Sequence, residues 1–408
     1  MAVWMTRFVV LLALSFVSNT NHFVRFVNVA GGQEVIKGKA KGPGNALPPS
    51  PQAKTKAPGS SLATPLPAPD MTAPNARQQL VGLFNPQSSM AMQMPTTELR
   101  SAPEMLGDQP PPVTRPPSDL ILNPDFPNQN LIQDTRILML PGPRGFKVAD
   151  NSSPRPIDRF YFAFNYFNNL NGDLNRRLGF PDARVDLYRE TFGFEKTVFN
   201  GYASFGLNLP LNTIDIRGTG EFDGTSTAFG DLTLSFKAAL YADPINDNWI
   251  SAGLAVTVPT GPDVVGGVDL PTATPHTTVL QPYIGWLWNH NEWYVHGFSA
   301  LDIPTDDRDI TFLFTDIGVG YYLYHTSNRT RCLTAIIPTF EVHVTTPLNH
   351  RNLITFEDPI GGIDEVNLTY GVNLRFGRNS WLAIAVITPV TDPQPMDIEA
   401  TAQFRIWF

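Results

Sequence analysis

From residue 158 to the end of the chain, apolar and polar side chains alternate with a period of two. Between Arg159 and Asn165, for example, every even position is Phe. The final stretch keeps the alternation up to Phe408. Because successive side chains of a β-strand point to opposite faces, this pattern predicts strands with one apolar and one polar face.

The stretches that alternate in this way predict an all-β region over residues 157–408. Twelve can be counted: 158–168, 184–197, 201–213, 228–242, 248–259, 277–289, 292–304, 312–325, 331–347, 364–376, 380–389 and 396–408. The first connections between them are alternately long and short, as in 169–183 (long) and 198–200 (short). Short turns at one end and longer loops at the other are typical of up-and-down barrels of the outer membrane.

Prolines recur at or near the ends of every second strand. They are Pro210, Pro259, Pro304, Pro347 and Pro389. Proline has no backbone N–H for a sheet ladder, so it is expected where strand pairing stops. We therefore expect these prolines to mark the external rim of a barrel. Charged residues occupy both faces of the predicted strand 184–197. This strand is therefore expected either to contain a β-bulge or to project beyond the membrane.

The N-terminal residues predict export from the cytoplasm. Arg7 precedes an apolar run, 8–17, which is too short to span a membrane and is typical of a signal peptide over 1–30. A short membrane anchor is the alternative.

Charged residues make up only 16% of the chain, against about 25% in ordinary soluble domains. The net charge of −8 argues against a nucleic-acid partner, and a single cysteine, Cys332, excludes an internal disulfide.

Residues 31–156 are rich in proline and predict a mostly disordered periplasmic linker. Two pieces, 77–84 and 131–140, have some apolar periodicity, which leaves docking on the barrel or short helices as an alternative.

A chain that is exported, alternates over an even number of strands and ends on an aromatic residue is predicted to be a transmembrane antiparallel barrel. Closure of such a barrel pairs every backbone group within lipid.

The last strand carries alternating Phe404, Ile406 and Phe408, which resemble the C-terminal signal read by the barrel-assembly machinery. Aromatic residues near strand ends are expected to form girdles at the two membrane interfaces, with ordinary packing in the core as the alternative. They are Trp286, Trp288, Trp293, Tyr294, Tyr321, Tyr322, Tyr324, Trp381 and Trp407.

The segments 230–237 and 253–261 resemble the pattern of the meta-pathway phenol-degradation family of outer-membrane proteins. The segments 337–343 and 396–408 resemble planctomycete members of that family. The resemblance covers about 158–408 and implies a barrel that acts as a transporter. It carries over no catalytic residues.

Polar side chains on the inner parity are the candidate lumen-lining residues: Arg159, Asp231, Lys237, Asp316, Glu341, His343, Arg375, Glu399 and Arg405. A barrel of about twelve strands has a narrow bore, so these charges would form either a selectivity path or a structural salt-bridge network. Both charge signs occur, so strong ion selectivity is not expected.

We therefore expect a channel for passive or weakly selective passage of small solutes, apolar or aromatic ones included. The expected partners are outer-membrane lipid, the assembly machinery and the solute. The alternative is a structural barrel that contacts the cell envelope through residues 31–150.

A phospholipase-like enzyme is a minor alternative, suggested by His325 and Ser327, which would lie at a short turn. His290, Glu292 and His296 share one parity, but Glu292 and His296 would be about 13 Å apart along a strand, too far for one metal ion. No catalytic residue, metal or cofactor is predicted.

Overall fold

The computed structural model describes residues 101–108, 138–142, 144–220, 222–267, 276–328, 331–351 and 362–408. The predicted signal peptide, 1–30, lies outside the described residues, and so does much of the predicted linker. Among the residues that are described, no helix is long and apolar enough to cross a membrane.

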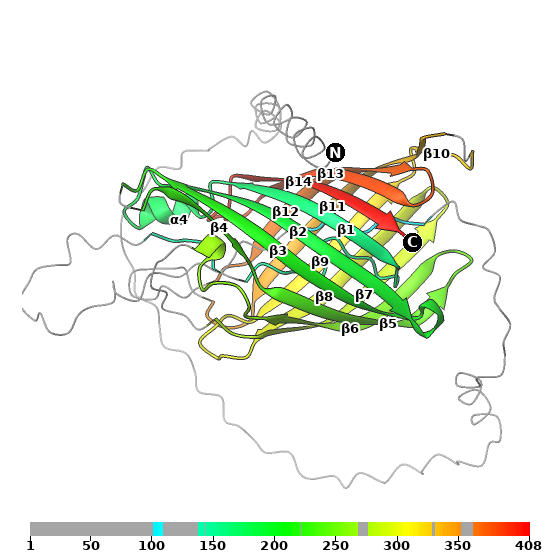
Figure 1. Cartoon of the computed structure of the whole chain (residues 1–408), viewed down its shortest axis with the longest axis horizontal. Coiled ribbons are helices and arrows are strands. Elements are labelled where there is room, and N and C mark those ends of the chain that lie inside the picture. Colours follow the sequence, from blue (N-terminus) through cyan, green and yellow to red (C-terminus); the bar gives the residue numbers. More distant parts are fainter. Residues whose placement is uncertain are drawn as a thin grey trace, which may run out of the picture. The chain divides into compact units, whose positions relative to one another are not determined.

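Fourteen strands are connected in one sheet (Figure 1). They are β1 (Arg159–Asn168), β2 (Arg184–Val198), β3 (Ala203–Arg217), β4 (Gly224–Phe229), β5 (Leu232–Asp243), β6 (Asn248–Val258), β7 (Val279–His290), β8 (Trp293–Pro304), β9 (Phe312–Tyr321), β10 (Tyr324–His325), β11 (Leu333–Pro347), β12 (Glu365–Phe376), β13 (Ser380–Pro389) and β14 (Ile398–Trp407). A short helix, α4 (Gly172–Arg177), lies between β1 and β2.

Twelve of these strands form a closed antiparallel ring, because β14 pairs with β1 as well as with β13. Phe162 lies opposite Phe404 in the closing ladder. The two remaining strands are additions to the ring: β4 pairs with β3, and β10 with β11. Chain neighbours are ring neighbours throughout, so the predicted all-β, up-and-down barrel is confirmed.

The exposed face of the ring is the apolar one. Along β1, buried and more exposed residues alternate, with Arg159 buried and Phe160 on the outside. Phe160, Phe205 and Tyr370 keep 44%, 54% and 52% of their surface exposed. Alternation in the sequence cannot show which face is outside, but the structure shows that the apolar face is. An apolar outer surface around a closed ring suits a lipid environment.

The connections differ in length at the two ends of the barrel. At the short-turn end lie the connections after β2, β5, β7, β9 and β12, together with the start of β1 and the end of β14. At the long-loop end lie the other connections, such as the one between β6 and β7. Pro304, Pro347 and Pro389 end β8, β11 and β13 at the long-loop end.

Pro210 departs from this pattern because it lies inside β3. The ladder between β3 and β5 runs from Ala203 to Asn208, and beyond it β3 continues to Arg217 paired with β4. Part of the connection between the predicted strands 201–213 and 228–242 is therefore a hairpin that extends the wall. The ladders of β2 show no register shift, so the charges of 184–197 fit a projecting strand rather than a bulge.

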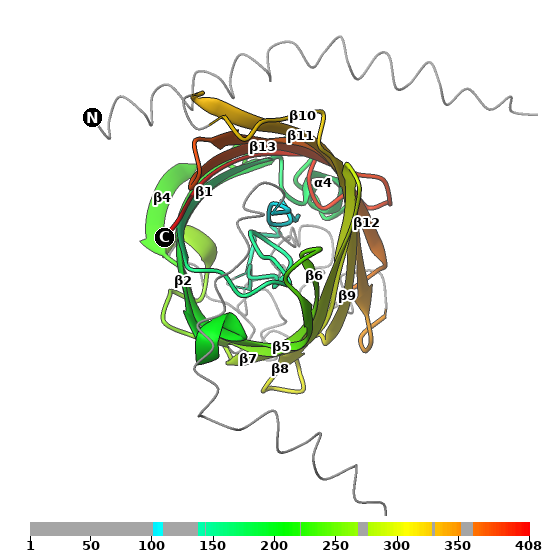
Figure 2. The same cartoon turned by 90° about the vertical axis from the view of Figure 1, so that its right-hand side faces the viewer.

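Two segments that precede β1 lie inside the ring (Figure 2). We call the described residues of these segments, 101–108, 138–142 and 144–157, together the plug. Ala102 donates its N–H to Asp247 Oδ2 in the turn after β5 (3.3 Å), at the short-turn end. Leu138 and Leu140 belong to a buried apolar cluster with Val264 of the loop between β6 and β7, at the long-loop end.

The two legs of the plug therefore run in opposite directions through the lumen. Arg155, near the end of the second leg, is back at the short-turn end, where its Nη1 lies 2.9 Å from Asp247 Oδ1. The legs are joined where the Met105 N–H donates to the Ser152 carbonyl (2.8 Å). The predicted disordered linker over 31–156 is wrong for the plug residues, which are largely buried because the barrel wall encloses them.

Candidate functional site: the filled lumen

The candidate lumen-lining residues point inward, and all but one are buried. The buried ones are Arg159, Asp231, Lys237, Asp316, Glu341, His343, Glu399 and Arg405. Arg375 is half-buried near the short-turn end, where its guanidinium lies over the rings of Trp381 (5.3 Å) and Trp407 (5.9 Å). Glu399 accepts a hydrogen bond from Asn165 Nδ2 (2.6 Å) on the neighbouring strand.

Near the short-turn end, a chain of ion pairs crosses from β14 to β5 through the plug. We call Glu104, Arg159, Glu195, Lys237 and Arg405 the Glu104 network. Glu104 pairs with Arg405 and, at 3.1 Å, with Arg159. Glu195 then lies 2.9 Å from Arg159 and 2.9 Å from Lys237.

The Glu104 network also holds the second leg of the plug. Lys237 Nζ donates to the Ser153 carbonyl (2.6 Å) and Arg159 to the Asn151 carbonyl (2.5 Å). Buried charges are tolerated where they are paired and hydrogen-bonded. Here Arg159 and Arg405 pair with Glu104 of the plug, and Lys237 donates to a plug carbonyl in addition to its pairing with Glu195 of the wall.

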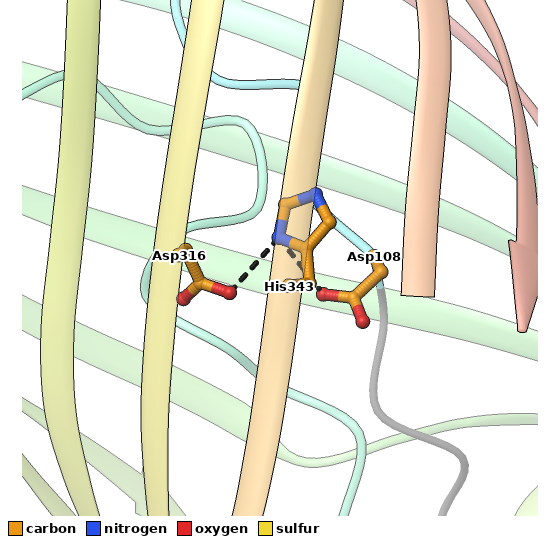
Figure 3. Close-up of side chains that lie close together, drawn as sticks. All are labelled: Asp108, Asp316 and His343. Carbon is orange, nitrogen blue, oxygen red and sulfur yellow. Dashed lines mark hydrogen bonds and ion pairs between the residues drawn. The ribbon is translucent and has the colours of Figure 1, made fainter. Parts of the chain in front are cut away.

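A second charged group, the central cluster, consists of Asp108, Lys147, Asp316 and His343 (Figure 3 shows three of them). Asp316 of β9 and His343 of β11 are directly opposite each other in the sheet, with Oδ1 and Nδ1 2.9 Å apart. From the plug come Asp108, whose Oδ1 is 3.3 Å from His343 Nδ1, and Lys147. Lys147 Nζ lies 2.6 Å from Asp108 Oδ1 and 2.6 Å from Asp316 Oδ1.

Glu341 of β11 holds the first leg by its backbone. Its two carboxylate oxygens accept the N–H groups of Leu106 and Gly107, each at 2.9 Å. His343 and His296 flank the same carboxylate at 3.3 and 3.7 Å. A carboxylate that accepts two backbone N–H groups makes charge-assisted hydrogen bonds, which are stronger than neutral ones.

Further contacts fix the second leg near the long-loop end. Arg144 pairs with Asp302 at the end of β8 and with Asp309 in the following loop (2.8 Å). Gln281 of β7 accepts the Val148 N–H (3.0 Å) and donates to the Phe146 carbonyl (2.9 Å). The wall thus binds the plug along its whole described length.

Apolar clusters lie at both ends of the lumen. At the long-loop end, Leu138 and Leu140 pack with side chains that include Leu170 and Met396. At the short-turn end the cluster consists of Ala102, Trp249, Leu287, Tyr294, Tyr322, Ala335, Ile337 and Trp381. The girdle prediction is therefore wrong for Tyr294, Tyr322 and Trp381, which face inward.

Trp407 also faces inward, where its Nε1–H donates to Glu104 Oε1 (3.0 Å). Trp288, Trp293 and Tyr321 lie on the outside. Trp288 and Trp293 are 43% and 51% exposed at the short-turn end. Trp293 packs against Tyr321, with ring centroids 4.6 Å apart. Phe404, Ile406 and Phe408 share the outer parity of β14, and the Phe408 ring stacks on Phe194 at 6.1 Å. Their role as an assembly signal stays a prediction.

Two small cavities remain between the plug and the wall on the side of β1, β2 and β3. Their volumes are about 30 Å³ and 20 Å³, room for single water molecules. Both are lined by Phe146 and Asp150 of the plug and by Tyr161 and Asn208 of the wall.

At the long-loop end, Asp231, just before β5, binds residues of the loop between β6 and β7. Its carboxylate accepts the N–H groups of Thr260 and Gly261 and lies 2.7 Å from His276 Nε2, whose Nδ1 is 3.2 Å from Asp263. Burial lowers the pKa of His276, but the hydrogen bond to Asp231 and the charges of Asp231 and Asp263 outweigh it. The pKa is therefore raised above its ordinary value of 6.5.

The residues considered for an enzyme site or a metal site do not come together in one place. His325 Nε2 is 3.3 Å from Glu292 Oε2 at the short-turn end, whereas His296 points into the lumen toward Glu341. His290 is exposed at the turn and contacts Asn291. The arrangement that could hold a metal ion is instead the central cluster, with one imidazole and two carboxylates.

Sequence reasoning missed the plug side of the lumen, namely Glu104, Asp108, Arg144 and Lys147. The sequence of the wall strands did contain an indication that another segment enters the lumen. Buried carboxylates must be paired, and the predicted inner faces carried acidic residues, such as Asp316 and Glu341, without enough cations beside them.

A closed antiparallel ring with an apolar outer face and a charged, filled lumen defines a transmembrane β-barrel of the outer membrane. Residues 181–331 match the model of the family described as "Putative MetA-pathway of phenol degradation". Over these residues, the match bears out the resemblance to this family that was seen in the sequence. No curated protein matches the chain.

Solved barrels are similar at low identity. An outer membrane channel from Pseudomonas putida F1 is 11% identical, with 63% of this chain and 97% of that chain covered and a TM-score of 0.46. The β domain of the Bordetella autotransporter BrkA is 14% identical, with 62% of this chain and 100% of that chain covered and a TM-score of 0.40. LpxR from Salmonella typhimurium is 8% identical, with 61% of this chain and 100% of that chain covered and a TM-score of 0.37.

Proposed function

We propose that this protein is a gated outer-membrane channel that its own plug closes in the conformation described. It would conduct small solutes, apolar or aromatic ones included, passively or with weak selectivity. The observation that carries the proposal is that wall side chains hold the plug through ion pairs and hydrogen bonds. Such contacts can break while the ladders of the barrel stay intact.

The lining of the lumen supports weak selectivity. Both charge signs occur in the Glu104 network and in the central cluster, so neither anions nor cations would meet a lumen of one sign. Apolar clusters at both ends would favour solutes that carry an apolar part.

The orientation in the membrane is part of the proposal. We place the short turns and the start of β1 in the periplasm, because short periplasmic turns and long external loops are the rule in such barrels. The chain has a single cysteine, Cys332, which is exposed beside the turn after β12. A membrane-impermeant maleimide should label it in opened cells but not in intact ones, and labelling of intact cells would reverse the orientation.

The gate is tested by Lys147→Met, which leaves the carboxylates of Asp108 and Asp316 facing each other without the ammonium between them. Removing one partner of a buried ion pair costs roughly 3–5 kcal/mol, here taken from docking of the plug. We expect a rise in planar-bilayer conductance and in solute flux into liposomes. Arg308→Met is the matched control, since it removes an external cation whose side chain is 64% exposed. An assembled Lys147→Met barrel with neither conductance nor flux would refute the channel.

The alternative is a structural barrel that contacts the envelope through residues 31–150, and the filled lumen is compatible with it. Deletion of 31–150 separates the two functions. Persisting solute uptake with loss of envelope integrity would favour the anchor, whereas increased uptake with an intact envelope would favour the gated channel.

A further inference from the structure

Lys147 occupies a position in the central cluster that resembles that of a bound cation. Its ammonium lies 2.6 Å from one oxygen of Asp108 and 2.6 Å from one oxygen of Asp316. The Nδ1 atom of His343 is 3.3 Å and 2.9 Å from the same two oxygens. The Lys147 ammonium and the His343 Nδ1 atom thus contact the same two carboxylate oxygens, and all four residues are buried.

We propose that Asp108, Asp316 and His343 form a binding site for a divalent transition-metal cation of the zinc class, and that Lys147 is the tethered occupant that closes it. The metal and the Lys147 ammonium would compete for the same carboxylate oxygens. Metal binding would therefore favour withdrawal of the second leg of the plug.

The geometry of the three groups suits such an ion. Their ligand atoms all lie within 4.8 Å of one another, so small side-chain shifts would bring each to the distance of about 2.0–2.2 Å that zinc requires. One imidazole with two carboxylates suits zinc and its neighbours, whereas calcium takes 6–8 oxygen ligands. Three protein ligands would leave one position open.

An independent observation is that polar atoms at the site lack hydrogen-bond partners. Among the described residues, Asp316 Oδ2 and His343 Nε2 are buried atoms without one. Glu341, at 3.3 Å from His343 Nε2, would orient the imidazole as carboxylates do for metal-bound histidines. The site thus has ligands, an orienting carboxylate and remaining capacity to accept a cation.

Because competition is reciprocal, a metal that displaces Lys147 would open the channel, and an undocked second leg would raise metal affinity. The opening step rests on the proposed function. The binding step does not, since it depends only on the cluster. The two are therefore measured separately.

The experiment is equilibrium dialysis of the refolded full-length barrel against zinc chloride, with calcium chloride as the comparison ion. Lys147→Met should bind about one zinc ion per chain more tightly than the wild type, because the competing ammonium is gone. Adding Asp316→Asn to Lys147→Met should weaken zinc binding by more than about tenfold. Calcium should show no such difference among the variants.

Equal zinc binding by Lys147→Met and the double variant would overturn the site. If Lys147→Met binds zinc but does not conduct, the channel proposal fails and the site stands. If it conducts without binding zinc, the site fails and the channel stands.

The wild type provides the test if Lys147→Met does not assemble. His343→Gln should lose one zinc ion relative to the wild type at millimolar free zinc, and zinc should raise wild-type conductance only. Identical zinc binding by the wild type and His343→Gln would refute the proposal.

Discussion

Replacement of Glu341 by Gln should undock the first leg of the plug while leaving the wall closed. Glu341 accepts the N–H groups of Leu106 and Gly107, one on each carboxylate oxygen and both at 2.9 Å. Gln has the same shape but only one oxygen, so one of these N–H groups would face an NH₂ group. A hydrogen bond to a charged group contributes about 1.5–3 kcal/mol, and a buried donor without a partner costs about 1–3 kcal/mol.

We therefore expect docking of the plug to weaken by about 3 kcal/mol. At 1.4 kcal/mol for each factor of ten, the undocked fraction should rise by about 100-fold. Planar-bilayer recordings should show a higher open probability. Trypsin should also cut after Lys147, which is fully buried while the plug is docked, because the first leg supplies its partner Asp108 and the Met105–Ser152 hydrogen bond that holds the second leg.

Asp364→Asn is the matched control, because it neutralises a carboxylate in a long loop with a side chain that is 53% exposed. Heat-modifiable migration in gels verifies that each variant is a folded barrel. An assembled Glu341→Gln barrel with the open probability and trypsin pattern of the wild type would show that Glu341 does not hold the plug.

Two further outcomes are expected. Phe408→Ala should lower the amount of assembled barrel in the outer membrane while export stays intact, which fractionation with immunoblotting measures; unchanged assembly would count against the terminal signal. The raised pKa of His276 means that its pairing with Asp231 and Asp263 stabilises the fold fully below about pH 6.5 and that this contribution is lost as pH rises through the folded-state pKa. The difference in unfolding temperature between the wild type and His276→Gln should therefore shrink at alkaline pH, and a difference that grows would refute this sign.

The barrel could be predicted because its signal is local. Period-2 alternation depends on residues that are neighbours in the chain, and the predicted stretch 380–389 coincides with β13. Prediction was less accurate where a strand leaves the regular wall. The stretch 312–325 was too long, since β9 ends at Tyr321 and β10 is a separate short strand. Beyond the wall, β4 could not be recognised because it lies outside the ring, where lipid no longer imposes an apolar face.

Most of the plug could not be predicted, because only the stretch 131–140 has some apolar periodicity and the partners of the plug are distant in the chain. Leu106 and Glu341 are separated by 235 positions, and Glu104 and Arg405 by 301. A Pro-rich segment normally stays disordered because it cannot bury enough apolar surface by itself. Inside a barrel the wall supplies that burial, and stiff Pro-rich chain has less conformational freedom to lose.

The inner face of the wall contains the information that the plug sequence lacks. Asp316 and His343 face each other across neighbouring strands, and Glu341 lies two positions along the same strand as His343. In a narrow bore, two such carboxylates need cations or N–H donors close by, since unpaired buried charges are strongly unfavourable. The wall strands β9 and β11 supply no Lys or Arg at these inward positions. Acidic inner faces that lack cations on their own strands therefore indicate that a segment from elsewhere in the chain, such as the one with Lys147, must enter the lumen.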